Sequence, residues 1–336
     1  MGSSDLLVAP PVGDDLGLTL RISAKATSYH RKMQNGLSPS GEPKLLTETH
    51  ATSPSFNRRV FLGSAFAATG LGIATYAGTH ARHEMEVTQR TIPIRNLPDS
   101  FQNFRIVQIS DIHLEEYTEP YFLERVVAQV NDLAPDLVLI TGDFVSFGPL
   151  SRQVSWNAAG VAAEILSRLK APQRFGILGN HDVNVGAAQV IEPLKAHGTP
   201  ILVDRHLPIE RGGDSVWICG CNDAGTQTPD LFAAIPANPG APVLFMCHEP
   251  DYVEKVVLHP RFPLIDLMLS GHSHGGQIRL PYIGPLVLPP MGEKYVQGLY
   301  QLKQMKLYVN RGLGTVGLPF RLNCPPEVTH ITLVRA

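Results

Sequence analysis

The 336-residue sequence predicts an α/β fold in which a two-layered core of mixed β-sheet is flanked by helices. Short, wholly apolar runs lie on either side of an amphipathic stretch after residue 104, as is typical of buried strands joined by a helix. After residue 274 the pattern changes to short strands separated by Pro and Gly turns. The change of pattern is why we expect a mixed sheet rather than a purely parallel one.

The first predicted elements follow one another as strand, helix and strand. Residues 105–110 are predicted to form a strand, residues 119–133 an amphipathic helix, and residues 136–141 a fully buried strand. Further strands are predicted at residues 174–178, 242–247, 264–269, 306–309 and 328–333.

Acidic, imidazole and amide side chains follow five of these strands. In chain order the blocks are Ser110-Asp111-Ile112-His113, Gly142-Asp143, Gly179-Asn180-His181-Asp182, His248 and Gly271-His272-Ser273-His274. Sites in open α/β sheets lie beyond the carboxyl ends of the strands, so we expect the blocks to converge. One such block alone is common by chance, but packing does not explain five of them, and a metal site is the favoured interpretation.

The donor types and their spacing suit divalent metals. Side chains alternate along an extended chain, so Asp111 and His113 are expected on one face of a strand end, where both can bind one ion. His272 and His274 repeat this spacing, and the glycines around them permit a turn that divides the two rings between neighbouring ions. Two cations about 3.5–4 Å apart can share one carboxylate and one water, so the sequence predicts a two-metal hydrolase site.

The ordered blocks resemble those of the calcineurin-like metallophosphoesterases over residues 104–277. The resemblance implies a four-layer αββα sandwich with mixed central sheets and the metal site at the carboxyl ends of the strands. It also implies two divalent metal ions (Mn, Fe or Zn) with Asp143 as the bridge. The implied ligands are Asp111, His113, Asp143 and His274 for one ion, and Asp143, Asn180, His248 and His272 for the other.

The activity implied by this resemblance is that of a metal-dependent phosphoesterase, in the first place a phosphodiesterase. A hydroxide bridging the metals would attack phosphorus, His181 would assist the leaving oxygen, and Asp182 would orient His181. A pyrophosphatase acting on a lipid-linked or nucleotide-sugar diphosphate is the alternative reaction. A non-catalytic metal-binding scaffold is the alternative of another class, although the intact ligands and His181 argue against it.

A glycine-rich segment after the metal blocks, Gly312-Leu-Gly-Thr-Val-Gly317, matches a dinucleotide-binding pattern. Leu318-Pro-Phe320 follows it, so no helix begins there to receive a pyrophosphate, and we interpret the segment as a loop at the rim of the metal site. Loops at residues 222–228 and 279–292 are expected to wall the substrate pocket. Residues that can bind a substrate phosphate near these loops, if they are not structural, are Asn310, Arg311 and Arg321.

The N-terminal region carries a second signal. Asn57-Arg-Arg-Val-Phe-Leu62 and the uncharged residues 60–79 resemble a bacterial twin-arginine export signal. About 20 residues span a bilayer at 1.5 Å per residue, and Thr79-His-Ala81 is a poor cleavage site, so cleavage and retention as a membrane anchor both stay open. We expect export by the twin-arginine machinery to the periplasm or to the outward face of the cytoplasmic membrane.

Four parts are expected along the chain: a disordered extension (1–56), the signal or anchor (57–81), a linker (82–98) and the metallophosphoesterase domain (99–336). A net charge of −2, from 28 basic and 30 acidic residues, marks no nucleic-acid surface. The expected substrate is therefore a small-molecule or lipid-linked phosphoester. The four cysteines, expected as buried free thiols, are Cys219, Cys221, Cys247 and Cys324.

Overall fold

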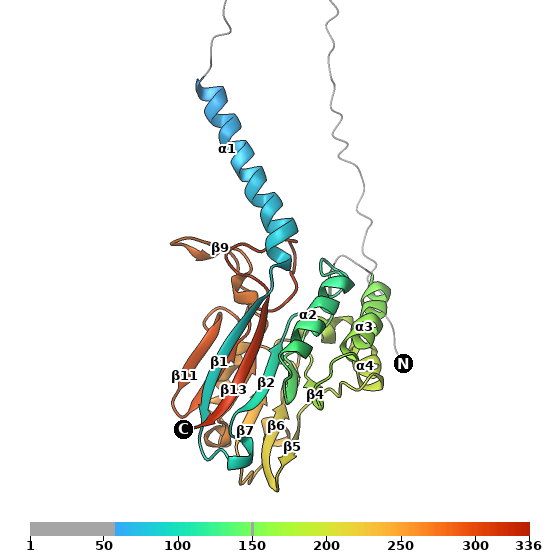
Figure 1. Cartoon of the computed structure of the whole chain (residues 1–336), viewed down its shortest axis with the longest axis vertical. Coiled ribbons are helices and arrows are strands. Elements are labelled where there is room, and N and C mark those ends of the chain that lie inside the picture. The colour runs from blue at the N-terminus through green and yellow to red at the C-terminus, as the bar shows by residue number, and fades with distance from the viewer. Residues whose placement is uncertain (1–57, 149–150) are drawn as a thin grey trace, which may run out of the picture. The chain divides into compact units, whose positions relative to one another are not determined.

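The computed structural model describes residues 58–148 and 151–336 (Figure 1). The extension predicted to be disordered, residues 1–56, lies outside the described residues. The described chain begins with helix α1 (Arg58–Thr75), which continues through the single turns η1 (Tyr76–His80) and η2 (Ala81–His83). By length and composition, the 26 residues Arg58–His83 form a helical stretch that can cross a membrane. Signal sequences share these properties.

Two mixed sheets form the centre of the domain. The first has the order β1-β13-β2-β3-β4, and the second has the order β11-β12-β8-β7-β6-β5. In the first sheet only β13 and β2 pair antiparallel, and in the second the two edge pairs are antiparallel while the inner pairs are parallel. The strands of the first sheet are β1 (Glu86–Ile94), β2 (Phe104–Ile109), β3 (Leu137–Ile140), β4 (Gln173–Gly176) and β13 (Glu327–Arg335). Those of the second are β5 (Arg205–Arg211), β6 (Asp214–Gly220), β7 (Val243–Met246), β8 (Leu267–Ser270), β11 (Gly298–Leu302) and β12 (Met305–Val309).

Helices cover the outer faces of both sheets. Over the first sheet lie α2 (Pro120–Asp132), α3 (Arg152–Leu166) and α4 (Asn180–Ala196), which Figure 1 shows on one side of the molecule. Over the second lie the short helices α5 (Leu231–Ala234) and α6 (Val253–Val256). Single turns occur at η3 (Asp99–Phe101), η4 (Pro250–Tyr252), η5 (Phe262–Leu264) and η6 (His274–Gly276).

Side-chain alternation along the strands produces the layers. In β3, Leu137 and Leu139 face the core between the two sheets, whereas Val138 and Ile140 face the helices. Likewise Leu244 in β7 faces the inner core, and its neighbour Val243 packs under α5 and α6. Both faces of each sheet are buried, which explains why these strands are continuous apolar runs in the sequence. The four-layer αββα arrangement with mixed sheets is thus confirmed.

The expected elements are present with bounds that differ by a few residues, but the expected linker is mostly a strand. β1 pairs in parallel with β13 over nine residues, and Ile92 and Ile94 are buried between the sheets. Residues 82–98 are therefore largely part of the domain. The first part of β1, from Glu86 to Thr91, is mostly polar, so the sequence does not show the apolar pattern of a strand there. A strand at the edge of a sheet needs few apolar side chains.

The end of the N-terminal helical stretch is attached to the domain. The Arg321 N–H donates a hydrogen bond to the Ala77 carbonyl at 3.1 Å. His83 Nε2 lies 2.8 Å from a Glu119 carboxylate oxygen, and Arg82 contacts the same carboxylate. Ala77 and Ala81 are buried, so this segment packs against the domain, whereas α1 itself has no buried residue.

A candidate metal centre

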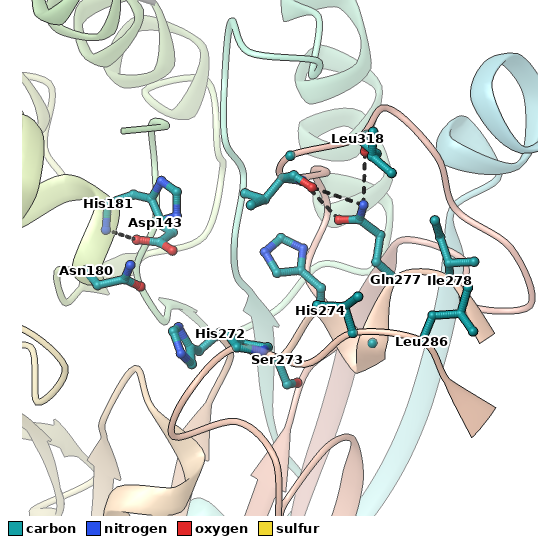
Figure 2. Close-up of a pocket in the computed structure, with 15 residues that line it drawn as sticks. Asp143, Asn180, His181, His272, Ser273, His274, Gln277, Ile278, Leu286 and Leu318 are labelled. Atoms are coloured by element: carbon teal, nitrogen blue, oxygen red, sulfur yellow. Dashed lines mark hydrogen bonds between the residues drawn. The ribbon is translucent and has the colours of Figure 1, made fainter. Parts of the chain in front are cut away.

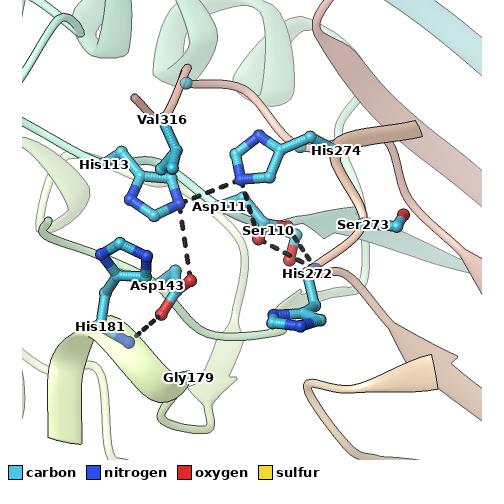
Figure 3. A network of polar contacts seen from close by, with 12 residues as sticks. Ser110, Asp111, His113, Asp143, Gly179, His181, His272, Ser273, His274 and Val316 are labelled. Carbon is cyan, nitrogen blue, oxygen red and sulfur yellow. Dashed lines mark hydrogen bonds and ion pairs between the residues drawn. The ribbon is translucent and has the colours of Figure 1, made fainter. Parts of the chain in front are cut away.

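All five polar blocks lie just beyond the carboxyl ends of strands. They follow β2, β3 and β4 in the first sheet and β7 and β8 in the second, with Asn180 and His181 opening α4. Figure 3 shows how the blocks from the two sheets meet in one network. The convergence expected from the sequence is therefore present.

The backbone of this centre is unusual. Five of the predicted ligands have positive φ: 50° at Asp111, 47° at His113, 54° at Asp143, 68° at His272 and 51° at His274. Non-glycine residues adopt this left-handed region rarely, at a cost of about 1–3 kcal/mol, and such residues cluster at functional sites. The expectation of an extended strand end at Asp-x-His is wrong, because β2 ends at Ile109 and the backbone turns at each ligand.

The carboxylate of Asp143 lies between two groups of donors. Its Oδ2 is 3.5 Å from His113 Nε2 and 3.1 Å from His248 Nε2. On one side, His113 and Asp111 form a compact group with His274, and on the other Asp143 groups with His248 and His272. His113 Nε2 and His274 Nε2 are only 3.1 Å apart (Figure 3). The Asp143 carboxylate thus contacts a ring from each group.

Contacts behind the rings orient them. Nδ1 of His248 lies 2.7 Å from the Thr141 carbonyl, so this nitrogen carries a proton and Nε2 faces the Asp143 carboxylate. Nε2 of His272 lies 2.9 Å from the Pro290 carbonyl, which leaves Nδ1 as the acceptor. His113 Nδ1 lies 3.0 Å from Ser146 Oγ. Backbone carbonyls and a hydroxyl thus direct the other nitrogen of each ring toward the centre.

Burial sets the protonation of most of these donors. It lowers the pKa of His272 to about 4 and holds the pKa of His113 and His274 well below the ordinary value, so these rings are neutral, as metal ligands must be. It raises the pKa of Asp111 to about 6. Burial alone would also raise the pKa of Asp143, but His248 and other imidazoles hold it well below its usual range.

His248 completes this charge balance. Burial by itself would lower its pKa, but the carboxylates of Asp143 and Asp111 raise that pKa well above the ordinary value. The buried carboxylates therefore need a positive charge beside them, which either a proton on His248 or a cation can supply. Asn180 Oδ1 is buried and lacks a hydrogen-bond partner among the described residues, and His248 Nε2 faces the Asp143 carboxylate. The unpartnered amide oxygen and the mixed imidazole and carboxylate donors fit divalent cations.

Two glycines make room for the donors. A Cβ on Gly179 would lie 2.6 Å from His248 Nε2 and would overlap Asp143 Oδ1. A Cβ on Gly271 would overlap Asp111 Oδ2. Only glycine fits at these positions, which explains the glycines that flank the polar blocks in the sequence.

His181 lies beside the centre with its ring fixed. The Phe147 N–H donates to His181 Nδ1 at 2.8 Å, so in the neutral ring the proton is on Nε2. The His181 N–H donates to Asp143 Oδ1 at 2.9 Å, and the ring meets that of His113 edge to face. Its location beside the predicted ligands (Figures 2 and 3) is the one expected from the sequence.

Asp182 contacts the backbone of two loops. Its carboxyl oxygens accept hydrogen bonds from the N–H groups of Phe144, Val145 and Gly179 at 2.9, 3.2 and 3.1 Å. Burial, and then the charge of Asp143, raise the pKa of Asp182 well above its ordinary value. These hydrogen bonds hold the loops after β3 and β4 together, and a direct role of Asp182 in orienting the His181 ring stays a prediction.

The three residues proposed for phosphate binding are engaged inside the protein. Arg321 is fully buried and donates to the carbonyls of Gly312, Gly314 and Cys324, among others. Arg311 pairs with Glu327 and Glu86, and Asn310 donates to Thr329 Oγ1. None of the three lines the cavity described next, so a contact with substrate stays a prediction for each of them.

A cavity of about 440 Å³ opens beside the centre (Figure 2). Its polar wall is formed by Asp143, Asn180, His181, His272, Ser273 and His274. Val316 and Gly317 line it as well, which agrees with the glycine-rich loop at the rim, and so does part of the expected wall at residues 279–292. Residues 222–228 do not line it. The side of the cavity opposite the polar wall is mainly apolar. The sequence does not predict this, because the residues of that side come from three separate segments.

The family described as calcineurin-like phosphoesterase matches residues 104–276, a range that contains every predicted metal ligand. The chain belongs to this family. It is therefore a metallophosphoesterase, a hydrolase of phosphoester bonds, and the family together with the clustered His and Asp residues indicates divalent metal ions. The four cysteines are free and buried, as expected.

Relatives of known sequence extend the similarity beyond the metal blocks. A Bacillus subtilis protein described as uncharacterized metallophosphoesterase YkuE is 34% identical, over 82% of this chain and 97% of its own length. An Escherichia coli protein described as phosphodiesterase YaeI is 32% identical, over 83% of this chain and 99% of its own length. A Danio rerio protein described as a transmembrane protein with metallophosphoesterase domain is 32% identical, over 79% of this chain and 61% of its own length.

Proposed function

We propose that this metallophosphoesterase is a two-metal phosphodiesterase. The observation that carries the proposal is the location of Asp143, whose carboxylate lies within 3.5 Å of His113 on one side and 3.1 Å of His248 on the other. A carboxylate shared between two donor groups is what a binuclear centre requires. The similarity to a relative named as a phosphodiesterase supports the choice of a diester over a monoester.

The proposed ligand sets are those implied by the sequence blocks. Asp111, His113 and His274 would hold one cation and Asn180, His248 and His272 the other, with Asp143 common to both. When bound, divalent cations would lower the pKa of a water molecule and offset the charge that develops on the phosphoryl oxygens. The chain's own contribution is to keep the rings of His113, His272 and His274 neutral and to keep Asp143 ionised. Carbonyl and hydroxyl contacts orient three of the rings.

His181 would act as a hydrogen-bond donor. Because its Nδ1 accepts from the Phe147 N–H, the neutral ring presents Nε2–H, which can donate to the leaving oxygen. A proton given up completely from this neutral ring would leave an unstable anion. We therefore propose that His181 stabilises the charge on the leaving oxygen, and that the oxygen takes its proton from solvent.

Cleavage of a diphosphate is the second candidate reaction. The apolar wall of the cavity favours a lipid-linked diphosphate as its substrate. A diphosphate differs from a diester only in its leaving group, so the same residues would serve.

Membrane attachment is also part of the proposal. The stretch Arg58–His83 is long and apolar enough to span a bilayer, and two relatives are named as transmembrane proteins. Arg58 and Arg59 at its start support a twin-arginine export route, which would place the domain on the outward face. Retention of the segment would be tested by N-terminal sequencing of the protein recovered from the membrane fraction.

The test of the reaction is metal-dependent hydrolysis by the full chain in lipid nanodiscs. After chelation, Mn, Fe, Zn or Mg is added back, and bis-(p-nitrophenyl) phosphate is compared with p-nitrophenyl phosphate. The proposal expects metal to restore cleavage and the diester to be preferred. Preference for the monoester, or bound metal without cleavage of either compound, would contradict it.

A further inference from the structure

The two walls of the cavity at the metal centre have opposite character. One wall consists of the metal-centre side chains and His181. The other is formed mainly by apolar residues from three segments, Ile278, Leu286, Val287, Pro289, Val316 and Leu318, with Gln277 as its polar member. Figure 2 labels Gln277, Ile278, Leu286 and Leu318 of this wall. A volume of about 440 Å³ lies in the range of small-molecule sites. A ligand that fills this cavity must therefore be polar at one end and apolar at the other.

The apolar wall continues onto the outer surface. Leu286 is 53% exposed, Val287 79% and Leu318 55%. Next to Leu286, the strands β9 (Arg279–Leu280) and β10 (Gly284–Pro285) form a small ribbon whose tip carries Tyr282 and Ile283, both exposed. A contiguous set of exposed apolar side chains marks an interaction surface, and a tyrosine beside aliphatic residues suits the interface of a bilayer.

The same wall adjoins the end of the membrane-length helix. Phe320, two residues beyond Leu318, packs so closely on Gly78 that a Cβ there would lie 2.8 Å from its ring. The next residue, Arg321, donates its N–H to the Ala77 carbonyl. Gln277 holds the segment in place, since its Nε2 donates to the carbonyls of Val316 and Leu318 at 3.2 and 3.0 Å (Figure 2). The chain segment that supplies Leu318 to the cavity wall therefore contacts the end of the apolar helical stretch through Phe320 and Arg321.

We infer that the substrate is a lipid phosphoester, with its phosphate at the metal centre and its hydrocarbon chain along the apolar wall. The inference rests on the proposed function, because it assumes that a phosphoester occupies the centre. A nucleotide or sugar diester would place its hydroxyl groups against the apolar side chains of Leu286, Val287 and Leu318, which offer them no hydrogen bond. A hydrocarbon chain buries these side chains instead, and the adjoining apolar helix keeps the cavity at the surface where lipids are present.

The first arm of the test measures turnover against chain length. The full chain in lipid nanodiscs, loaded with metal, is given p-nitrophenyl methyl, propyl, butyl and hexyl phosphates. Each methylene that enters the groove is expected to raise kcat/KM by about fourfold. Leu286→Asp and Leu318→Asp should each lower the ratio of kcat/KM for the hexyl ester to kcat/KM for the methyl ester by about tenfold or more. The reason is that burying a carboxylate against a hydrocarbon chain is unfavourable.

The matched control is Leu258→Asp. Leu258 is 83% exposed and lies outside the cavity, so this variant should keep the wild-type ratio. The lipid inference is overturned if the wild type cleaves the methyl ester but its kcat/KM does not rise with chain length. It is also overturned if the hexyl-to-methyl ratio of kcat/KM falls equally in all three variants. In both cases the phosphodiesterase proposal stands.

The second arm measures binding without turnover. Titration calorimetry with methyl, butyl and hexyl phosphonates, which the enzyme cannot cleave, should show affinity rising with chain length in wild type and in Leu258→Asp, but not in Leu318→Asp. If no ester is cleaved and the phosphonates still bind in this order, the proposed reaction fails and the chain-binding groove is upheld. An affinity that is independent of chain length overturns the inference that the groove binds a hydrocarbon chain.

Discussion

The two walls of the cavity differ in how firmly their side chains are held. On the polar wall, His272 and Asp143 are buried and fixed by backbone contacts, and both residues have a left-handed backbone. On the apolar wall, Leu286, Val287 and Leu318 are half exposed or more. The difference indicates that the fold preorganises the chemistry, whereas surface loops select the rest of the substrate. Changes to the polar wall should therefore affect every substrate, and changes to the apolar wall should affect only some.

The largest effect is expected from Asp143→Asn. The amide keeps the shape of the side chain but removes the charge that both donor groups share, so kcat for bis-(p-nitrophenyl) phosphate should fall by about a hundredfold or more. Metal content measured on the same preparation should fall as well. A variant that retains wild-type kcat at saturating metal would show that Asp143 is not the shared ligand.

His181→Ala should also reduce kcat by about a hundredfold, but with metal content unchanged. The reason is that His181 would contact the leaving oxygen instead of serving as one of the seven ligands. The loss should be larger for an alkyl leaving group than for p-nitrophenolate, which needs little stabilisation. Equal losses for both leaving groups would argue against the donor role.

Arg321→Met is expected to act on stability. Arg321 is fully buried and donates to several loop carbonyls, so its removal leaves these carbonyls unpaired and should lower the free energy of unfolding by about 2–3 kcal/mol. Urea denaturation measures the change. If Arg321 instead contacts the substrate phosphate, KM should rise while the denaturation midpoint stays at the wild-type value.

Asp182→Asn should have the smallest effect of the four. The amide retains one acceptor oxygen where the carboxyl group accepts three backbone N–H groups, so we expect a loss of about 1 kcal/mol in stability. A several-fold loss of kcat should accompany it, because the loops that carry Asp143 and His181 loosen together. A large loss of kcat without a change in stability would favour a direct contact between Asp182 and His181.

Local patterns in the sequence were enough to locate most of the fold and the donors. Apolar runs such as residues 136–141 marked strands because both faces of each sheet are buried. The sequence does not predict the edge strand β1, because the first half of that strand is polar and its parallel partner β13 lies at the other end of the chain. The surroundings of Asp182 and Arg321 were equally hidden, because their hydrogen-bond partners are backbone groups that no sequence pattern reveals.

The sequence by itself determined the type of chemistry. Glycine-flanked carboxylates, imidazoles and an amide placed after buried strands specify metal donors through short-range order alone. Only the tertiary structure decided that Asp143 lies between two donor groups, that the backbone turns left-handed at five predicted ligands, and that an apolar wall faces the centre. These features depend on how two sheets and three distant loops pack together, and packing of this kind is a property of the whole chain rather than of any segment.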